Sequence, residues 1–326
     1  MNNQPLVSVL IPCYNHEDFL DDCLTGILKQ DYDNIELLIC DDNSMDNSFE
    51  KIKSYEQRLR QRFSYVKILR NEKNQGVTKN INRMLACSNG EFIKIIASDD
   101  VMEEHAVGKM VQFLISHSAV DVVVVNGAKI SECQHYPDYL PGEKIYSQKP
   151  NFSGKDLFER TYRLNNIFAP GVMVRKTVYD KYGYYDEKIA IEDLEFWLRI
   201  LLDKKTVFAF LDEVLIYYRI NQNSMTSLAG NSGLEQRRIK FHLAELQILN
   251  KYRSGVNDRL YAETVLFRIL SEKGIAVSNR LSELEKLVNE ECHNFNLWKN
   301  ISFKTHVYYY YALFRYKVKK IILSFR

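Results

Sequence analysis

Short apolar runs alternate with amphipathic segments along the first half of the chain. The apolar runs are rich in β-branched residues and predict buried strands at residues 6–11, 35–40, 66–69, 92–96 and 121–126. Between them, apolar residues at three- and four-residue steps predict helices at 19–28, 48–62, 77–86 and 104–117. Successive strand–helix units build a mostly parallel sheet with helices on both faces, so we predict an α/β fold.

Polar clusters follow three of these strands, at residues 12–15, 41–44 and 98–100. In sheets of this kind ligands bind beyond the carboxyl ends of the strands. We therefore expect the three clusters to meet along one rim of the sheet.

The second half of the chain is less regular. A loop at 131–150 precedes a helix at 154–163, a strand at 171–174, a helix at 192–202 and strands at 206–210 and 214–219. The Gly-, Ser- and Asn-rich stretch 227–233 predicts a boundary between an α/β domain, residues 1–228, and an α-helical region, residues 229–326.

Composition excludes several classes of protein. With 44 basic and 42 acidic residues the net charge is +2, which gives no reason to expect a nucleic-acid partner. The six cysteines are scattered without a C-x-x-C pair, as expected of free thiols in a reducing compartment. The N-terminus lacks the features of a signal peptide, and no window holds eighteen uninterrupted apolar residues. We therefore expect a cytoplasmic protein, or one at the inner face of the cell membrane.

Asp99 and Asp100 stand directly after a predicted buried strand. Adjacent carboxylates repel each other unless a cation lies nearby, and a hard divalent cation prefers oxygen ligands. The alternative is that they cap a helix, because Glu103 and Glu104 follow. Asp42 likewise belongs either to the same rim or to a simple Asx-turn.

Glu192 and Asp193 open a predicted helix, where one carboxylate is either a general base or part of an acidic helix start. Tyr14 is either an ordinary rim aromatic or a ring that stacks on a nucleobase. The stretch 74–76 precedes a helix and by itself indicates a plain turn.

Five sequence blocks resemble the family-two glycosyltransferases, which have the GT-A fold, and especially those that build bacterial surface polysaccharides. The resemblance covers roughly residues 6–226 and rests on VSVLIPCYNHEDFLDDCLTGILKQ, IELLICDDNSMDNS, NEKNQGVTKNIN, GEFIKIIASDD, and FAPGVMVRK with YGYYDEKIAIEDLEFWLRI. These blocks occur in the family's order and spacing, which is a far more specific signal than any single aspartate pair.

The resemblance implies a role for each matching residue. Asp100 would be the main ligand of Mn²⁺ or Mg²⁺, Asp99 would approach the ribose and the metal, and Asp193 would be the general base beside Glu192. The nucleotide would be bound by Pro12, Tyr14, Asn15, Asp42, Asn74, Gly76 and Lys79. Many members of the family have Arg instead of Lys79, and many have His where this chain has Asn221.

The implied activity is inverting transfer of a sugar from a nucleoside diphosphate, UDP by the family's habit, to a hydroxyl of a glycan or lipid-linked acceptor. The Q-x-x-R-W pattern of processive members is missing, which predicts one sugar per encounter. A nucleotidyltransferase or a dinucleotide-dependent dehydrogenase would need glycines after the first strand, and IPCYNHEDF has none. A catalytically silent sugar-nucleotide-binding or scaffold subunit is the remaining alternative.

The last segment, residues 303–326, has an apolar stripe and six basic residues without an acidic one. This pattern predicts either an amphipathic helix on an anionic membrane surface or a packing helix with a solvated basic face. The C-terminal helices also offer a surface for oligomerisation.

Overall fold

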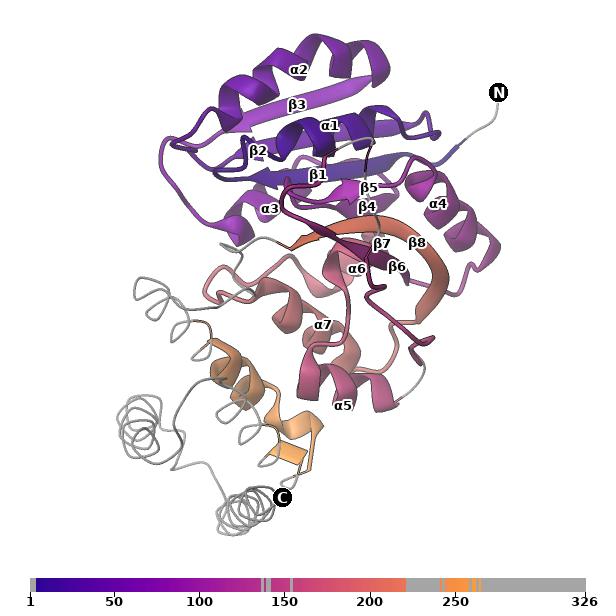
Figure 1. Ribbon diagram of the computed structural model, residues 1–326. Coiled ribbons are helices and arrows are strands. Elements are labelled where there is room, and N and C mark those ends of the chain that lie inside the picture. The colour runs from indigo at the N-terminus through magenta and orange to yellow at the C-terminus, as the bar shows by residue number, and fades with distance from the viewer. Residues whose placement is uncertain are drawn as a thin grey trace, which may run out of the picture.

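A computed structural model describes residues 4–135, 138, 142–152, 155–220, 241, 244–257, 260, 261 and 264. The predicted alternation of strands and helices is present in the first half of the chain (Figure 1). The elements are β1 (Val7–Cys13), α1 (Leu20–Leu28), β2 (Ile35–Asp41), α2 (Ser48–Arg62), β3 (Tyr65–Arg70), α3 (Val77–Leu85), β4 (Phe92–Ile95), β5 (Val101–Met102) and α4 (Ala106–Ser116).

Two elements were not predicted from the sequence pattern, namely the short strand β5 in the first half of the chain and the helix α6 in the second half. The elements of the second half are β6 (Val122–Ser131), α5 (Lys155–Leu164), the 3₁₀ turn Ala169–Gly171, β7 (Val172–Arg175), α6 (Lys176–Tyr182), α7 (Glu192–Leu202), β8 (Phe208–Ile220) and the 3₁₀ turn Arg253–Gly255. Residues 244–251 are helical as well. The predicted boundary at 227–233 and the basic segment 303–326 lie outside the described residues.

One eight-stranded sheet runs through the described part of the chain in the order β3-β2-β1-β4-β7-β6-β8-β5. The first four strands are parallel, β6 and β8 are parallel to each other, and β7 runs antiparallel to both of its neighbours. The predicted α/β class is confirmed, and the sheet is mixed because β7 and β5 run antiparallel to their neighbours.

The first strand ends two residues later than predicted, because Pro12 does not end it. Leu10 accepts a hydrogen bond from the backbone of Ile96 on the β4 side, whereas Cys13 accepts one from Asp42 on the β2 side. Since successive residues of a strand alternate sides, Pro12 faces the β4 side, beyond the last β4 pairing at Leu10. Because Pro12 has no pairing partner on that side, its missing N–H removes no hydrogen bond from the sheet. The strand therefore continues to Cys13, and the polar residues 14–15 follow at the rim.

The two strands predicted at 206–210 and 214–219 are one strand, β8. Its register against β6 shifts between Val125 and Asn126 and again between Asn126 and Gly127. At the first shift Asp212 and Glu213 are left without a pairing partner in β6. These two polar residues interrupt the apolar pattern in the sequence, but the strand continues through them.

Two apolar clusters cover the faces of the sheet. One contains buried side chains of α1, α2 and α4, and the other contains those of α3, α5, α6 and α7 (Figure 1). Ile248, Leu249 and Tyr252 join the second cluster, so this part of the C-terminal region packs on the α/β domain. Within the described residues, no helix has the length and apolarity needed to cross a membrane.

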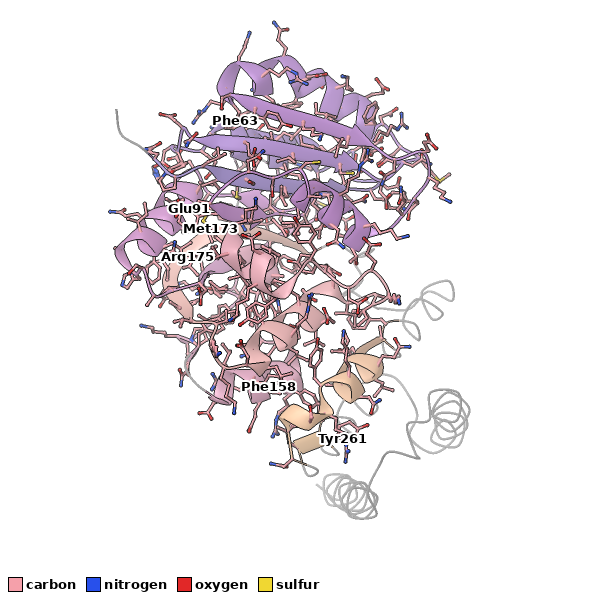
Figure 2. All side chains as sticks on the ribbon, turned by 180° about the vertical axis from the view of Figure 1, so that it is seen from behind. Phe63, Glu91, Phe158, Met173, Arg175 and Tyr261 are labelled. Carbon is pink, nitrogen blue, oxygen red and sulfur yellow. The ribbon has the colours of Figure 1, made fainter. Side chains whose placement is uncertain are left out.

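The antiparallel junction between β4 and β7 joins the two halves of the sheet. Arg175, at the end of β7, lies 3.6 Å from the carboxylate of Glu91, just before β4 (Figure 2). The start of β7 consequently lies at the carboxyl end of β4. This is the edge of the sheet at which the three polar clusters were predicted to meet.

Candidate active site

The loops after β1, β2 and β4 meet through hydrogen bonds, which confirms the predicted rim. The Asn15 backbone N–H donates to Ser44 Oγ over 3.0 Å, and the Met45 N–H donates to Asn15 Oδ1 over 2.8 Å. His16 Nδ1 lies 2.8 Å from Ser98 Oγ, which ties the first loop to the third. Asn15 adopts the left-handed backbone conformation, with φ of 53°, that lets the chain turn here.

Asp42 holds the loop between β3 and α3. Its Oδ1 accepts hydrogen bonds from the Asn71 side chain and the Gln75 N–H, and its Oδ2 accepts one from the Gly76 N–H, all over 2.8 Å. The interpretation of Asp42 as a simple Asx-turn residue is wrong, because both of its carboxylate oxygens bind residues 71–76. The local contact is made by Asp41, which accepts hydrogen bonds from the N–H and the hydroxyl of Ser44. Asp42 is therefore a buried acceptor that fixes residues 71–76 against the rim.

The residues expected to bind the nucleotide surround this loop. Tyr14 is 40% exposed directly after β1, so its ring is accessible to a ligand. Asn74 and Lys79 are exposed, and Gly76 has φ of 89°, a conformation that favours glycine.

Asp99 and Asp100 do not cap a helix. The strand β5 follows them, and α4 begins only after His105, so the capping interpretation is wrong. Asp100 is buried, with Oδ1 accepting the Arg219 N–H over 3.0 Å. Its Oδ2 is buried without a hydrogen-bond partner in the described structure, whereas the Asp99 side chain is 16% exposed.

This arrangement fits a divalent cation. Burial, together with the neighbouring charge of Asp99, raises the pKa of Asp100 well above its ordinary value. A cation beside the pair would supply the positive charge that the carboxylates lack and a partner for the Asp100 oxygen. Separately, the ligand atoms of Glu103, Glu104 and His105 lie within 4.8 Å of one another, but this group is part of the turn before α4.

Arg219, at the end of β8, holds the turn formed by Asp99 and Asp100 through hydrogen bonds. Its guanidinium is fully buried and donates to the Asp99 carbonyl over 3.0 Å, to Asp22 Oδ2 over 2.8 Å and to carbonyl groups of residues 131–134. The end of β8 thus connects α1, the turn after β4 and the loop after β6.

Glu192 and Asp193 are the first residues of α7, as predicted. Asp193 Oδ2 accepts a hydrogen bond from the Asn165 amide over 3.1 Å, and Oδ1 accepts the Leu194 N–H over 2.7 Å. Burial raises the pKa of Asp193, and burial together with Asp193 raises the pKa of Glu192 to about 8. A carboxylate with a raised pKa is a stronger base than one in water, which suits proton removal from a hydroxyl.

The strand β7 ties the chain segment before it to the rim. Met173 pairs with Lys94 of β4, and the buried Lys94 ammonium donates to the Pro170 carbonyl and, over 3.3 Å, to that of Val172. Residues 170–172 therefore lie at the carboxyl end of β4. Asn165 lies earlier in the same segment and donates to Asp193.

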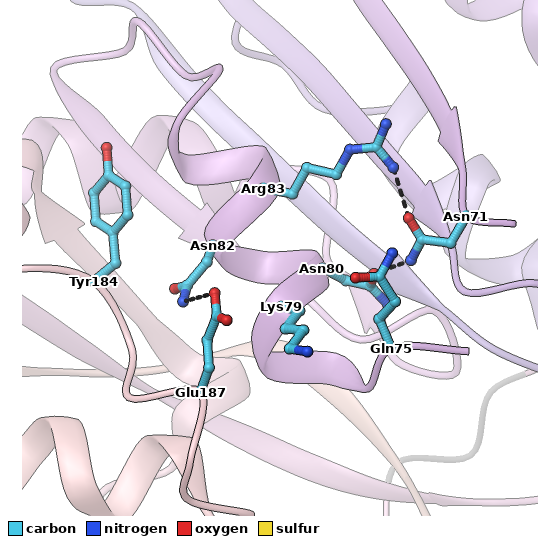
Figure 3. A pocket seen from close by; sticks show the side chains of 8 residues that line it. All are labelled: Asn71, Gln75, Lys79, Asn80, Asn82, Arg83, Tyr184 and Glu187. Carbon is cyan, nitrogen blue, oxygen red and sulfur yellow. Dashed lines mark hydrogen bonds between the residues drawn. The ribbon is translucent and has the colours of Figure 1, made fainter. Parts of the chain in front are cut away.

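A pocket of about 510 Å³ lies between α3 and the loop before α7 (Figure 3). Arg83 donates to Asn71 over 2.6 Å, and Asn71 also contacts Asp42. Across the pocket, Asn82 donates to the carbonyl of Tyr185 and to the carboxylate of Glu187. The lining residues are Asn71, Gln75, Lys79, Asn80, Asn82, Arg83, Tyr184 and Glu187. The helix α3 thus links the loop held by Asp42 to the segment that leads to Asp193.

Sequence reasoning missed several residues of this region. Lys94 and Arg219 were visible as charges within apolar strands, a pattern that indicates a buried cation with partners. His16, Asn71 and Asn165 carried no such signal, because their partners lie 82, 29 and 28 positions away in sequence.

Comparisons with known proteins agree with this architecture. The family model described as "Glycosyl transferase family 2" matches residues 8–183. An uncharacterized glycosyltransferase of Haemophilus influenzae is 26% identical over 240 residues, covering 70% of this chain and 69% of that protein. The UDP-Glc:alpha-D-GlcNAc-diphosphoundecaprenol beta-1,3-glucosyltransferase WfgD of Escherichia coli is 25% identical over 222 residues, 68% of this chain and 80% of that protein.

The fold also matches a solved glycosyltransferase. The crystal structure of S. aureus TarS in complex with UDP-GlcNAc superposes with a TM-score of 0.63 at 20% identity, covering 87% of this chain and 79% of that chain. The predicted GT-A fold is confirmed.

Proposed function

Since the chain belongs to glycosyltransferase family 2, we propose that it transfers single sugars, with inversion, from a UDP-sugar to a hydroxyl of a glycan or lipid-linked acceptor. The chain is a sugar transferase with relatives in polysaccharide biosynthesis, and we place its reaction in the assembly of a cell-surface polysaccharide. The observation that carries the proposal is the Asn165–Asp193 hydrogen bond, which orients a half-buried carboxylate of raised pKa at the start of α7.

In the proposed reaction Asp193 removes the proton from the attacking hydroxyl. The oxygen attacks the anomeric carbon from the face opposite the diphosphate, so one displacement inverts that centre. Asp193 Oδ1 is occupied by the Leu194 N–H and Oδ2 by the Asn165 amide, which orients the carboxylate. Burial and the charge of Asp193 raise the pKa of Glu192, which favours the protonated form of Glu192 and reduces the repulsion between the two carboxyl groups.

The donor would lie along the rim after β1, β2 and β4. Tyr14 offers an exposed ring for the base, and Asp42 shapes the pocket wall by holding Gln75 and Gly76. Asn15 fixes the first loop, and Lys79 supplies a positive charge for the diphosphate.

Asp99 and Asp100 are the residues that would hold Mn²⁺ or Mg²⁺. When bound, such an ion neutralises charge on the departing diphosphate. The carboxylate of Asp99 is partly exposed, and Oδ2 of Asp100 has no hydrogen-bond partner in the described residues. We therefore assign both residues as ligands, whereas the sequence favoured Asp100 as the main one.

The names of the relatives support the choice of donor and acceptor. WfgD is named for a UDP-Glc donor and a diphosphoundecaprenol-linked acceptor, and TarS was solved with UDP-GlcNAc. A silent scaffold subunit has no need for Asp100 and Asp193, both of which this chain retains in constrained positions.

The test is Asp193→Asn, with Asp203→Asn at the exposed end of the same helix as the control. We expect sugar transfer to fall by about 10²–10⁴-fold in Asp193→Asn. UDP binding in the presence of Mn²⁺, measured by calorimetry, should stay close to wild type in both variants. Turnover near the wild-type rate in Asp193→Asn would rule out its role as the base.

We also propose that residues 303–326 contact an anionic membrane, which would bring the site to a lipid-linked acceptor. Replacing Lys317, Lys319 and Lys320 by Gln in the full chain should reduce flotation with vesicles rich in anionic lipid. Unchanged flotation would favour the packing-helix alternative.

A further inference from the structure

His16 is a rim residue to which neither the sequence nor the proposed reaction assigns a role. It follows the Asn15 turn, and its side chain is 25% exposed. Its ring lies between the buried hydroxyl of Ser98 and the partly exposed carboxylate of Asp99.

The imidazole is held in one orientation. Nδ1 lies 2.8 Å from Ser98 Oγ, and the ring contacts Phe19 edge to face at 5.8 Å. The His16 backbone N–H donates to Ser48 Oγ over 2.9 Å, which fixes the main chain as well. In metal sites, a partner on one ring nitrogen is what sets the tautomer and aims the other nitrogen at the ion.

The other nitrogen points at the proposed cation site. Nε2 of His16 lies 3.9 Å from Oδ2 of Asp99, which is too long for a hydrogen bond. Adjacent ligand atoms of an octahedral ion, each about 2.1 Å from it, lie about 3 Å apart. The observed separation is longer than a hydrogen bond, and a closure of about 1 Å would bring both atoms onto one ion.

We propose that Nε2 of His16 is a ligand of the divalent cation, together with the carboxylate of Asp99. This inference rests on the proposed function, because it uses the cation assigned there. Ser98 is then a positioning residue that acts through the imidazole, and the cation site is built from the loops after both β1 and β4.

The test is the electron spin-echo modulation of Mn²⁺ bound to the full-length protein with excess UDP. An imidazole nitrogen bound directly to Mn²⁺ gives a ¹⁴N modulation, which oxygen ligands do not. We expect this modulation in the wild type and its loss in His16→Gln, with Mn²⁺ affinity reduced at least about tenfold. Ser98→Ala should keep the modulation in bound Mn²⁺ but weaken Mn²⁺ affinity by about 10–100-fold.

The matched control is His105→Gln, which removes the only imidazole from the separate group Glu103, Glu104 and His105. The modulation should persist in this variant. A modulation that survives in His16→Gln, or that disappears only in His105→Gln, overturns the assignment of His16. If Mn²⁺ binds with UDP but the wild type shows no modulation, the inference fails while the proposed function stands. Absence of any UDP-dependent Mn²⁺ binding would refute both.

Discussion

The side-chain amide of Asn165 donates a hydrogen bond to Oδ2 of Asp193 over 3.1 Å, joining the segment before β7 to the first turn of α7. Asn165 has a left-handed backbone with φ of 44°, a conformation that asparagine tolerates better than most residues. The contact orients the carboxylate of the proposed base, and several consequences can be measured.

Removing the Asn165 side chain should shift the pH dependence of transfer. Its hydrogen bond lowers the pKa of Asp193, which burial raises, so Asn165→Gly should raise that pKa further. Because the base acts when deprotonated, the acidic limb of kcat/KM should move to higher pH. Lys204→Gly, at another left-handed position, φ 58°, is the control and should leave the profile unchanged. An acidic limb that stays in place in Asn165→Gly would contradict this account.

Asp42→Asn should weaken donor binding. The carboxylate accepts three hydrogen bonds, two of them from backbone N–H groups, and an asparagine NH₂ would oppose one of those donors. Losing one such charge-assisted bond costs about 1.5–3 kcal/mol, so we expect UDP affinity to fall about tenfold or more. Calorimetry with Asp33→Asn, whose side chain is 85% exposed, provides the comparison.

Glu192→Gln should stabilise the fold at alkaline pH. The folded pKa of Glu192, about 8, lies above the ordinary value of 4.5, so the folded state binds the extra proton between these values. Stability is therefore lost as pH rises from about 4.5 to about 8, and the neutral glutamine avoids that loss. We expect the gain in Tm over wild type to be larger at pH 9 than at pH 5. Glu50→Gln, on the exposed face of α2, should show no such trend, and an equal gain at both pH values would refute the explanation.

Arg219→Lys should destabilise the whole rim. A lysine ammonium cannot make all the hydrogen bonds that the planar Arg219 guanidinium donates to Asp22, to the Asp99 carbonyl and to the loop after β6. Because Asp22 is buried, the loss of its partner would leave a buried charge without compensation. Breaking a buried pair of this kind costs about 3–5 kcal/mol. Urea unfolding would measure it, with Arg58→Lys on the exposed face of α2 as the control. A loss below about 1 kcal/mol would show that the guanidinium contacts are dispensable.

The local sequence pattern determined the strands β1 to β4, the helices between them and the convergence of three polar loops. The strands and helices follow from the spacing of apolar residues, which is set within a few neighbouring positions. The convergence follows because the carboxyl ends of parallel strands lie at the same edge of the sheet. The acidic start of α7 was also readable, because Glu192 and Asp193 precede an apolar helical stripe.

Tertiary structure decided the surroundings of each member of an acidic pair. Asp41 accepts hydrogen bonds from the nearby Ser44 while Asp42 holds a distant loop, and Asp99 is partly exposed while Asp100 is buried. Adjacent residues of one type carry the same local signal, so their roles depend on partners such as Arg219, 119 positions beyond Asp100. The antiparallel pairing of β7 with β4 and the contact between Asn165 and Asp193 were likewise decided by packing, because no local periodicity links residues so far apart in sequence.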